Sequence, residues 1–427
     1  MAENMETKYL IIGNSAGGVG GASGIREFDD KGRLVMVSGE AHPAYSRPLI
    51  AEHLAAGCSL ERMLYRAPDF YEKNKIETIY RRVEKLDTAG KAALLDDGTR
   101  ISWEKLLLAV GGLPIVPKTP GMELKGVFTF MTLEDARSIS SYLTDGRVVV
   151  IGGGLIGMSV SEALVKRGAQ VSVVELKDYI LNTILDAEAG ALAANAVIEA
   201  GVELITGHTV AAVNGDSDAK VTGVTLDDKR YIPCHMVIMA IGVRPNLQLA
   251  NGTGIKVNRG ILVDRHMATS IPGIYACGDC AEAYDFVTGS DRLTPIWPNA
   301  HIGGMVAGRN MAGAVTEYAG GTVMNSLEYF GLEMVTAGLP FPPDSSYEVL
   351  KGADSGVYRK LILKGGKIIG LIFAGNIEKS GVVFSLMRDR VDVSNFKKLL
   401  VESELNLAAL PREIWQAKLK VPAAQKS

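Results

Sequence analysis

Three glycines and one carboxylate in the middle of the chain have the residue types and spacing of a dinucleotide-binding site. Gly152, Gly154 and Gly157 follow an apolar strand at residues 148–151, and Glu175 ends the next strand, 23 residues after Gly152. Such glycines let the backbone approach a pyrophosphate at the N-terminus of a helix, where free N–H groups point at it. A carboxylate at the end of the second strand accepts from ribose hydroxyls and repels a 2′-phosphate, so it predicts NADH rather than NADPH.

A second stretch of the same design lies near the N-terminus. A short apolar strand at residues 9–12 runs into Gly13-Asn14-Ser15-Ala16-Gly17-Gly18. Ser15 replaces the middle glycine, and its hydroxyl can itself donate to a phosphate. Glu40, 27 positions past Gly13, is the carboxylate expected to contact the ribose. Two units of strand, glycine turn, helix and strand therefore predict two dinucleotide sites.

The helix after the first glycine turn has an unusual composition. Each glycine in a helix interior costs roughly 1 kcal/mol relative to alanine. We therefore expect packing on the sheet and a bound cofactor to hold this helix in place. The glycines concerned are Gly17, Gly18, Gly20, Gly21 and Gly24.

Further elements must hold these two turns in position. Turn residues between β-branched runs predict a hairpin over residues 92–101, a strand at 106–110, a strand–turn–strand region over 211–231 and a buried strand at 236–241. Beyond about residue 320 the pattern changes. Strands at 358–363 and 368–374 are expected to pair across Lys364-Gly365-Gly366-Lys367. Amphipathic segments follow at 396–401 and 411–420, and Pro411 fits the first turn of a helix.

The bulk properties limit the class of protein. A chain of 427 residues suits two or three domains. Its net charge of −3 argues against nucleic acid as a partner, and no apolar run approaches the roughly 20 residues of a membrane span. No basic targeting segment opens the chain, and the four cysteines are too few for a disulfide framework. We expect a cytoplasmic protein.

The order of motifs resembles the pyridine nucleotide–disulfide oxidoreductase superfamily over nearly the whole chain. Residues 106–114 (LLLAVGGLP) are similar to the segment where the family's chain leaves its FAD domain, with Val110 in place of the usual Thr, and residues 240–246 (AIGVRPN) to the segment where it returns. Residues 269–279 (TSIPGIYACGD) resemble the second FAD motif, and residues 297–300 (WPNA) the segment beside the flavin ring.

This resemblance implies an α/β fold with two Rossmann-like three-layer nucleotide-binding domains, the NAD domain inserted in the FAD domain, and an α+β C-terminal interface domain. The implied boundaries are 1–115 and 241–320 for the FAD-binding domain, 116–240 for the NAD-binding domain and 321–427 for the interface domain, which often forms a dimer.

The motifs and the resemblance together give two sets of binding residues. For FAD they are Gly13, Ser15, Ala16, Gly18, Glu40, Arg47, Pro48, Val83, Ala109, Gly111, Gly278, Asp279, Trp297 and Ala300. For NADH they are Gly152, Gly154, Leu155, Ile156, Gly157, Glu175 and Gly242.

One stretch indicates the branch of the superfamily. Residues 44–49 (AYSRPL) resemble the Tyr-Ser/Asn-Arg-Pro stretch of rubredoxin reductases, ferredoxin reductases and nitrite reductase flavin domains. Arg47 is then a cation beside the flavin, where it would stabilise the reduced anion, or else part of a structural ion pair. Glu52 and Ser159 stand where some relatives pair a Lys with a Glu, which makes Glu52 a candidate residue of the nicotinamide pocket.

Cysteine and histidine chemistry is not expected at the reaction centre. The redox cysteine of disulfide-active members is missing, and Cys58 is expected to be a small core residue. Cys277 and Cys280 lie inside the FAD motif, where small residues pack against the cofactor. The six histidines show no metal spacing, and only His301 lies beside the flavin segment. No cluster of cysteines can hold iron–sulfur, so the electrons need an external acceptor.

The sequence therefore predicts an FAD-dependent NADH:acceptor oxidoreductase. Rubredoxin or ferredoxin is the expected carrier, and the chain also resembles the FAD/NAD oxidoreductases that accompany carbon monoxide dehydrogenase. The alternatives are an NADH oxidase using oxygen and a low-turnover redox sensor or complex subunit; a disulfide reductase is disfavoured. Residues 351–427 hold 14 Lys and Arg against 7 Asp and Glu, which suits an acidic carrier or is simply a solvated surface.

Overall fold

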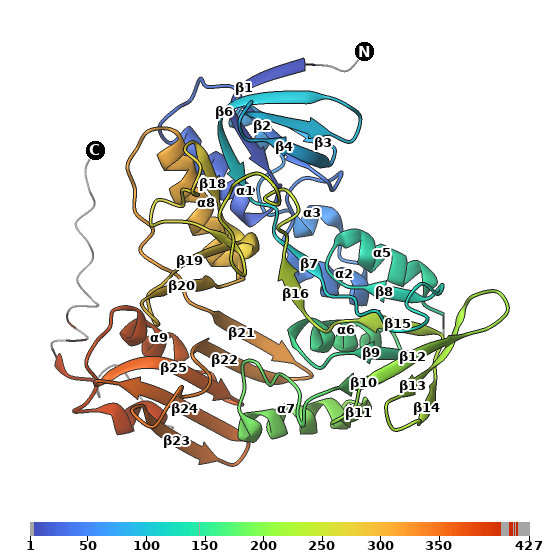
Figure 1. Ribbon diagram of the computed structural model, residues 1–427. Coiled ribbons are helices and arrows are strands. Elements are labelled where there is room, and N and C mark those ends of the chain that lie inside the picture. Colours follow the sequence, from blue (N-terminus) through green and yellow to red (C-terminus); the bar gives the residue numbers. More distant parts are fainter. Residues whose placement is uncertain (1–3, 145, 403–409, 413, 415, 417–427) are drawn as a thin grey trace. The chain divides into compact units, whose positions relative to one another are not determined.

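The computed structural model describes residues 4–144, 146–402, 410–412, 414 and 416. It divides into two compact units, Met1–Asp178 with Ala200–Val323, and Tyr179–Glu199 with Met324–Ser427 (Figure 1). The first unit contains both glycine turns.

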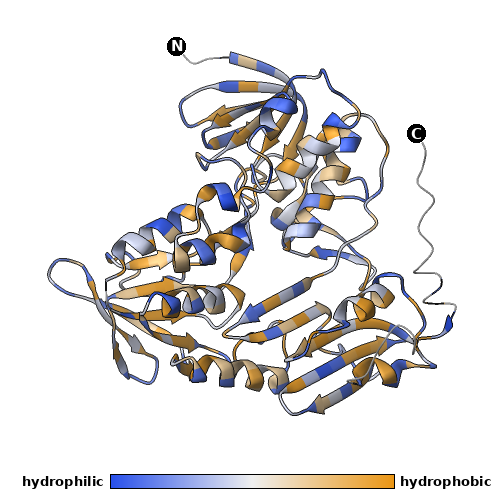
Figure 2. Ribbon diagram, turned by 180° about the vertical axis from the view of Figure 1, so that it is seen from behind, coloured by the Kyte–Doolittle hydropathy of each residue, from blue (hydrophilic) through white to orange (hydrophobic). Residues whose placement is uncertain are grey.

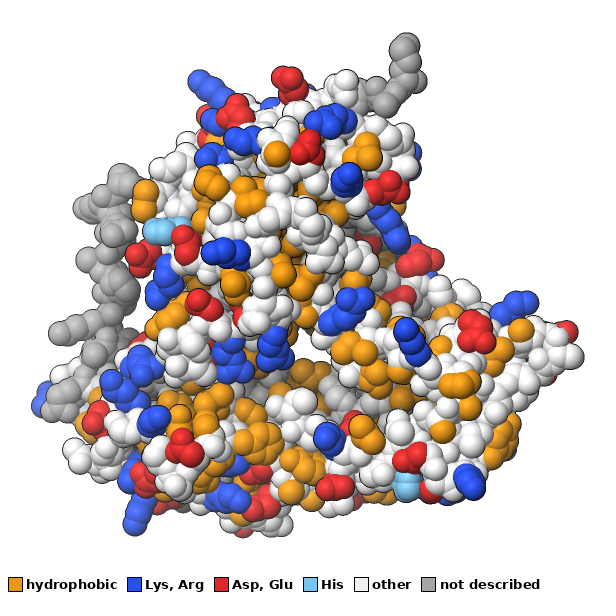
Figure 3. Space-filling view, viewed as in Figure 1, with side chains coloured by type: hydrophobic (Ala, Val, Ile, Leu, Met, Phe, Trp, Pro, Cys, Tyr) orange, Lys and Arg blue, Asp and Glu red, His pale blue; other side chains and the backbone are white. Residues whose placement is uncertain are grey.

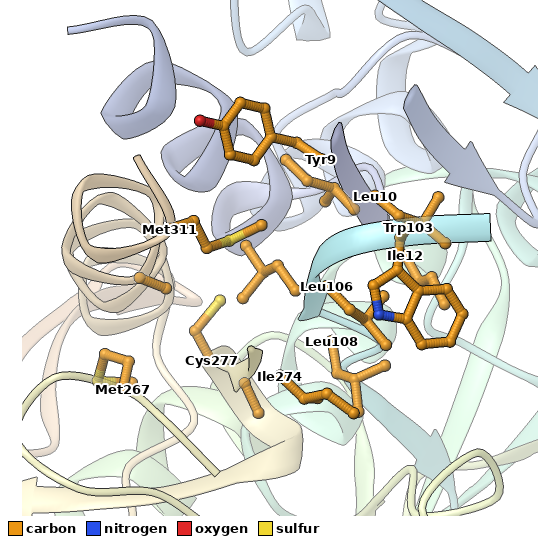
Figure 4. Close-up of a cluster of buried hydrophobic side chains, with 14 of the residues drawn as sticks. Tyr9, Leu10, Ile12, Trp103, Leu106, Leu108, Met267, Ile274, Cys277 and Met311 are labelled. Atoms are coloured by element: carbon orange, nitrogen blue, oxygen red, sulfur yellow. The ribbon is translucent and has the colours of Figure 1, made fainter. Parts of the chain in front are cut away.

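The first unit is built around a seven-stranded sheet in the order β3-β2-β1-β6-β5-β4, with β18 paired to β6. Its central strands are parallel and buried, which explains their continuous apolar runs. Figure 4 shows part of the resulting core, which includes Tyr9, Trp103 and Leu106. The strands are β1 (Asn4–Ile12), β2 (Leu34–Ser38), β3 (Ile76–Tyr80), β4 (Val83–Asp87), β5 (Ala92–Leu95), β6 (Arg100–Leu108) and β18 (Ile274–Ala276).

Helix α1 (Ala16–Arg26) owes its glycines to a second helix, α8 (Trp297–Met311). A Cβ at Gly24 would clash with the carbonyl oxygen of Met305, and a Cβ at Gly308 with that of Gly21. The two backbones therefore lie closer than any larger residue would permit. Packing on the sheet was expected, and it is present, since a Cβ at Gly21 would also meet Leu107. The role of α8 was not foreseen.

A second sheet in the first unit is entirely parallel, in the order β11-β10-β9-β15-β8. Helix α5 begins with a capping box between Thr132 and Asp135, and α6 follows the second glycine turn. The elements are β8 (Val127–Thr129), α5 (Leu133–Tyr142), β9 (Arg147–Ile151), α6 (Leu155–Lys166), β10 (Gln170–Glu175), β11 (Glu203–Thr206) and β15 (Met236–Met239).

Smaller elements complete the first unit. A two-stranded ribbon carries the chain between the two large sheets, and helix α2 packs on both α5 and α6. The ribbon is β7 (Gly112–Pro114) with β16 (Val243–Pro245). One small sheet consists of β12 (Val210–Gly215), β13 (Val221–Leu226) and β14 (Tyr231–Pro233), and the other of β17 (Ile261–Leu262), β19 (Ala281–Asp285) and β20 (Ser290–Leu293). The helices are η1 (Arg47–Leu49), α2 (Ile50–Ala56), α3 (Leu60–Met63), α4 (Phe70–Lys73) and η2 (Gly278–Cys280).

The second unit is a five-stranded antiparallel sheet in the order β21-β22-β25-β24-β23, and its strands carry mostly apolar residues (Figure 2). Asp186, just before α7, accepts from Lys360 Nζ at 2.9 Å and from the hydroxyl of Tyr358 at 2.6 Å, and all three are buried. The elements are α7 (Ala187–Glu199), β21 (Met324–Tyr329), β22 (Leu332–Gly338), β23 (Glu348–Asp354), β24 (Val357–Lys364), β25 (Lys367–Ala374), α9 (Ser380–Arg388) and η3 (Lys397–Val401).

The α/β class expected from the sequence is confirmed, as are the hairpins β5–β6 and β24–β25. The strand expected at 106–110 is the end of the longer β6. The segment 179–199, expected within the NAD-binding domain, packs instead on the sheet of the second unit, and the proposed domain boundaries remain predictions. The helix expected at 411–420 lies largely outside the described residues. Among those residues, no helix is both long and apolar enough to cross a membrane.

Candidate functional site

The first glycine turn forms a tight cradle at the end of β1. Gly13 has φ +116°, a conformation that residues with a Cβ rarely adopt, and its N–H donates to Val37 O at 2.9 Å. A Cβ at Gly18 would clash with the carbonyl of Gly13, so this position in the first turn of α1 accepts only glycine. Ser15 is the N-cap of α1, its side chain caps no N–H of the helix, and the first turn holds no acidic residue. An anion at this helix N-terminus is therefore electrostatically favoured.

The second turn repeats this geometry. Gly152 has φ +107° and donates to Val174 O at 2.8 Å, and a Cβ at Gly157 would clash with the carbonyl of Gly152. Gly154 is the N-cap of α6, whose first turn also lacks acidic residues. A Cβ at Gly154 would have no heavy atom within 4 Å, so the packing of the protein does not require glycine at this position. Close approach of a ligand would require it, and the cradle fits a pyrophosphate.

Glu175 stands beside the second turn as expected. Its side chain accepts from the N–H of Gly153 at 2.7 Å and from the N–H of Lys177 at 2.8 Å, and the residue is only 8% exposed. A carboxylate has about four acceptor positions, so two remain for ribose hydroxyls.

Glu40, the corresponding acid beside the first glycine turn, is held by side chains. Its carboxylate accepts from Arg47 Nη2 and, at 2.6 Å, from the hydroxyl of Tyr45. Arg47 also donates to Met131 O at 3.0 Å, and the hydroxyl of Tyr45 accepts from the N–H of Leu133 at 3.0 Å. The structure therefore shows Arg47 in an ion pair, which was one of its two expected roles, and its place beside a flavin stays a prediction.

The charges of this cluster support one another. Burial acts to lower the pKa of Arg47, but Glu40, Tyr45 and Asp279 together outweigh it, so the net shift is upward. Burial raises the pKa of the Tyr45 phenol, which therefore stays protonated and donates. Burial also raises the pKa of Asp279, although the positive charge of Arg47 opposes this effect. Among the described residues no side chain donates a hydrogen bond to Asp279, which leaves this carboxylate available for a ligand hydroxyl.

The segments of the second FAD motif meet at the start of α8. Gly278 has φ +75°, and a Cβ there would lie 3.3 Å from the Cβ of Ala300. Trp297 opens α8, and its ring packs edge-on against Tyr65 with centroids 4.9 Å apart. This arrangement brings Asp279, Ala300 and the α1 turn together in one unit, since α8 packs along α1.

His301 and Arg66 join this site, and the sequence had indicated only the histidine. His301 Nδ1 lies 3.4 Å from the carbonyl oxygen of Ala16, and Nε2 lies 3.4 Å from Arg66 Nη2. A carbonyl can only accept, so Nδ1 carries the proton and Nε2 accepts from Arg66. Burial, aided by the charge of Arg66, lowers the pKa of His301. The imidazole is thus neutral at the N-terminus of α1.

The remaining predicted residues lie as follows. Ala109 follows β6, and its carbonyl abuts Gly13. Gly111 and Gly242 immediately precede the two ribbon strands β7 and β16, with φ +65° and +125°. Pro48 is in η1, Val83 opens β4 and packs on the core, and Leu155 and Ile156 open α6. Glu52 is exposed on α2, which packs on α6, the helix that carries Ser159. Its role in a nicotinamide pocket stays a prediction.

The cysteines are buried spacers rather than nucleophiles. Cys277 and Cys280 are fully buried, Cys277 lies among apolar side chains (Figure 4), and Cys280 Sγ donates to Leu108 O at 3.6 Å. Burial raises the pKa of Cys277 well above its usual range and that of Cys280 to about 11. Thiols of this kind react poorly. Cys58, expected in the core, is instead only half-buried in the loop after α2.

One group of possible metal ligands was not anticipated from the spacing of the histidines. His208, Asp227 and Asp228 place ligand atoms within 4.8 Å of one another. Asp227 already accepts from His208 Nδ1 at 3.0 Å and from the N–H of Thr209 at 3.4 Å, and Asp228 pairs with Arg230. These bonds stabilise the turn between β13 and β14, and they explain why the three side chains lie together without a metal.

Two glycine turns of the same geometry lie in one compact unit, each beside its own carboxylate, and they fit a scaffold for two dinucleotides. The family model described as "Pyridine nucleotide-disulphide oxidoreductase" matches residues 7–304. The chain therefore belongs to this family, whose members bind FAD and NAD(P)H, and it is an NAD(P)H-dependent oxidoreductase.

Relatives of known role match over most of the chain. It is 32% identical to the NADH-dependent phenylglyoxylate dehydrogenase subunit epsilon of Aromatoleum evansii over 96% of this chain and 97% of that one. It is 29% identical to the NADH-rubredoxin oxidoreductase of Clostridium acetobutylicum over 87% and 92%. Among solved structures, the covalent putidaredoxin reductase–putidaredoxin complex matches with a TM-score of 0.86 at 25% identity, over 97% and 99%. The second and third of these are, by name, reductases of the small carriers rubredoxin and putidaredoxin.

Proposed function

We propose that the protein holds FAD at the first glycine turn, takes a hydride from NADH bound at the second, and passes the electrons to a small carrier protein. The observation that carries this proposal is the pair of equivalent cradles in one unit. FAD, when bound, supplies the ability to accept a hydride and to release electrons singly.

The residues of the first site divide the work of holding FAD. The N-terminus of α1, with Ser15 and Ala16, receives the pyrophosphate, and Glu40 accepts from the adenosine ribose. Asp279 accepts from the ribityl chain. Arg47 supplies positive charge between Glu40 and Asp279, and Trp297 and Ala300 border the ring. Gly278 is required because of its positive φ and its contact with Ala300.

At the second site, the N-terminus of α6 receives the pyrophosphate of the dinucleotide. The two free acceptor positions of Glu175 bind ribose hydroxyls, and its negative charge repels a 2′-phosphate. NADH is therefore the proposed donor, in preference to NADPH.

The acceptor is proposed to be an acidic one-electron carrier such as rubredoxin or ferredoxin. Two named relatives act with rubredoxin or putidaredoxin, which supports this choice. The excess of basic residues in 351–427 suits such a partner only in part. Arg359 and Lys360 are buried, and Lys351 and Lys397 pair with Glu188 and Glu348. Basic and acidic side chains are interspersed over this unit in the view of Figure 3.

Carrier docking is tested by charge reversal. Exposed Lys364 and Lys398 are changed to Glu, and carrier reduction is measured at rising salt. A slower rate at low salt, which converges with the wild-type rate at high salt, supports docking on this unit. Equal rates at every salt concentration contradict it. A link to carbon monoxide dehydrogenase and a homodimer through this unit stay predictions.

A second candidate function is that of the NADH-oxidising subunit of a larger dehydrogenase complex. It is favoured by the match over nearly the full length of both chains to a protein named as a subunit of an NADH-dependent dehydrogenase. In that case electrons pass between this chain and its partner subunits, and a free carrier is reduced slowly. A partner that co-purifies in fixed ratio, together with weak reduction of added carriers, would favour this candidate.

The first experiment is an anaerobic titration of the purified protein with NADH, followed through the flavin absorbance, with NADPH as the matched comparison. Stoichiometric bleaching by NADH, and much weaker bleaching by NADPH, is expected. A yellow protein that NADH does not bleach would leave FAD binding intact and contradict hydride transfer. A protein that binds no flavin would overturn the proposal as a whole.

A further inference from the structure

The carboxylate expected to hold the FAD ribose is connected to the other half of the first unit. Glu40 lies just after β2, next to the first glycine turn. Each of its two oxygens accepts from a side chain of the following loop, one from Tyr45 at 2.6 Å and the other from Arg47. The Arg47 guanidinium also lies 5.4 Å from the centroid of the Tyr45 ring.

Both of these side chains also form hydrogen bonds with the backbone of residues 131–133, at the start of α5. The hydroxyl of Tyr45 accepts from the N–H of Leu133 at 3.0 Å, and Arg47 donates to Met131 O at 3.0 Å. Asp135 completes the set, since its carboxylate accepts from the N–H of Met131 at 2.8 Å and from that of Thr132 at 3.1 Å. Helix α5 lies beside the second parallel sheet, which carries the second glycine turn.

The Glu40 carboxylate keeps free acceptor positions for a ligand. Tyr45 and Arg47 occupy two of the roughly four acceptor positions of Glu40, so two ribose hydroxyls can bind without displacing them. Tyr45 is buried, whereas the side chains of Arg47 and Glu40 are 35% and 29% exposed. A ligand that fixes Glu40 therefore also restrains Tyr45, because the Tyr45 hydroxyl donates to Glu40 and accepts from the N–H of Leu133 at the same time.

We infer that Tyr45 is a positioning residue that links FAD binding at Glu40 to the order of the α5 N-terminus, and so to the nucleotide site carried by the second sheet. This inference rests on the proposed function in one respect, that FAD binds at the first glycine turn. It assigns to this chain a coupling between its two nucleotide sites that does not depend on contact between the two ligands.

The test is hydrogen exchange at residues 131–135, measured by mass spectrometry on the FAD-loaded protein and on protein from which FAD has been removed. FAD is expected to slow exchange there about two- to tenfold, the effect of one hydrogen bond of ordinary strength. Tyr45→Phe keeps the ring and removes only the hydroxyl. In this variant the ratio of the two exchange rates is expected to fall to about one.

Tyr71→Phe is the matched control. The Tyr71 hydroxyl also bridges a backbone N–H, that of Ala44 at 2.7 Å, and a side chain, Asn14 at 2.8 Å, and neither of these partners belongs to α5. Tyr71→Phe is expected to keep the effect of FAD on residues 131–135, even if it weakens FAD binding. Glu40→Gln supplies a second variant in case Tyr45→Phe does not fold, and it too should lower the ratio.

The outcomes separate this inference from the proposed function. FAD binding is measured independently by the quenching of flavin fluorescence. If FAD does not bind, the proposed function is wrong. If FAD binds but leaves residues 131–135 unchanged in the wild type, or if Tyr45→Phe and Tyr71→Phe keep the same ratio, the coupling through Tyr45 is overturned and FAD binding stands.

Discussion

The two glycine turns are nearly identical in their backbones and differ in what surrounds them. In both, the first glycine has a positive φ and the third packs on the carbonyl of the first. Behind the first turn, α1 is packed along α8 through glycines on both helices. Behind the second, α6 contains only Gly157 beyond its N-cap. The two turns thus share one backbone geometry, while the first turn is packed against more of the surrounding structure than the second.

The acidic residues show the same contrast. Glu175 is held by N–H groups of its own turn and of the residues just after it. Glu40 is held by Tyr45 and Arg47, which continue to α5. A site tied to distant elements suits a nucleotide that stays bound, and a self-contained site suits one that exchanges. This difference supports FAD at the first turn and NADH at the second.

The contrast between the helices is tested most strongly by Gly24→Ala. Although alanine favours helices, its Cβ would clash with the carbonyl of Met305, and we expect a loss of about 1–3 kcal/mol in unfolding free energy. Gly381→Ala in α9 is the matched control, because a Cβ there meets no heavy atom within 4 Å, and it should stabilise by about 0.5–1 kcal/mol. Urea unfolding measures both. Equal effects of the two changes would mean that α1 and α8 are not in close contact.

The middle position of the two turns gives the second test. Since a Cβ at Gly154 would meet no heavy atom within 4 Å, Gly154→Val should cost no more than about 1 kcal/mol of stability, as a poorer N-cap, but should weaken NADH binding roughly 10- to 100-fold by occupying the space of the pyrophosphate. Gly154→Ser copies Ser15 of the first turn and should retain most of the binding. Calorimetric titration with NADH measures this. Unchanged affinity in the valine variant would show that the dinucleotide does not lie against Gly154.

The fold was predictable where local chemistry determines it. Strand, glycine turn and helix follow from neighbouring residues, and both turns were located to the residue. The packing of Gly24 on Met305 could not be predicted, because it joins positions 281 residues apart that share no local pattern. For the same reason the sequence left two roles open for Arg47, since its partner Met131 lies 84 residues away. Arg66 gave no signal at all.

The third test concerns the acids. Glu175→Gln keeps the size of the side chain and removes the charge, and we expect NADH to bind roughly tenfold more weakly while NADPH loses little or gains, because repulsion of the 2′-phosphate is gone. The ratio of the two affinities is the measurement. Glu40→Gln is the control: it should weaken FAD binding and leave the ratio of NADH to NADPH affinity nearly unchanged. An unchanged ratio in Glu175→Gln would exclude Glu175 as the source of selectivity.

The smallest effect expected is a pH dependence of stability that arises beside the first glycine turn. His301 meets the start of α1 at Ala16, and burial lowers its pKa below the usual 6.5. Its contribution to stability is complete above pH 6.5, and it decreases as the pH falls toward the folded pKa, because the unfolded chain then binds a proton that the folded chain does not. His301 is only half-buried, so solvent keeps the effect small. His301→Asn should therefore lose less stability than the wild type between pH 7.5 and 5.5, as measured by thermal unfolding of both proteins. Parallel losses in the two proteins would show that this imidazole is not held neutral by burial and the charge of Arg66.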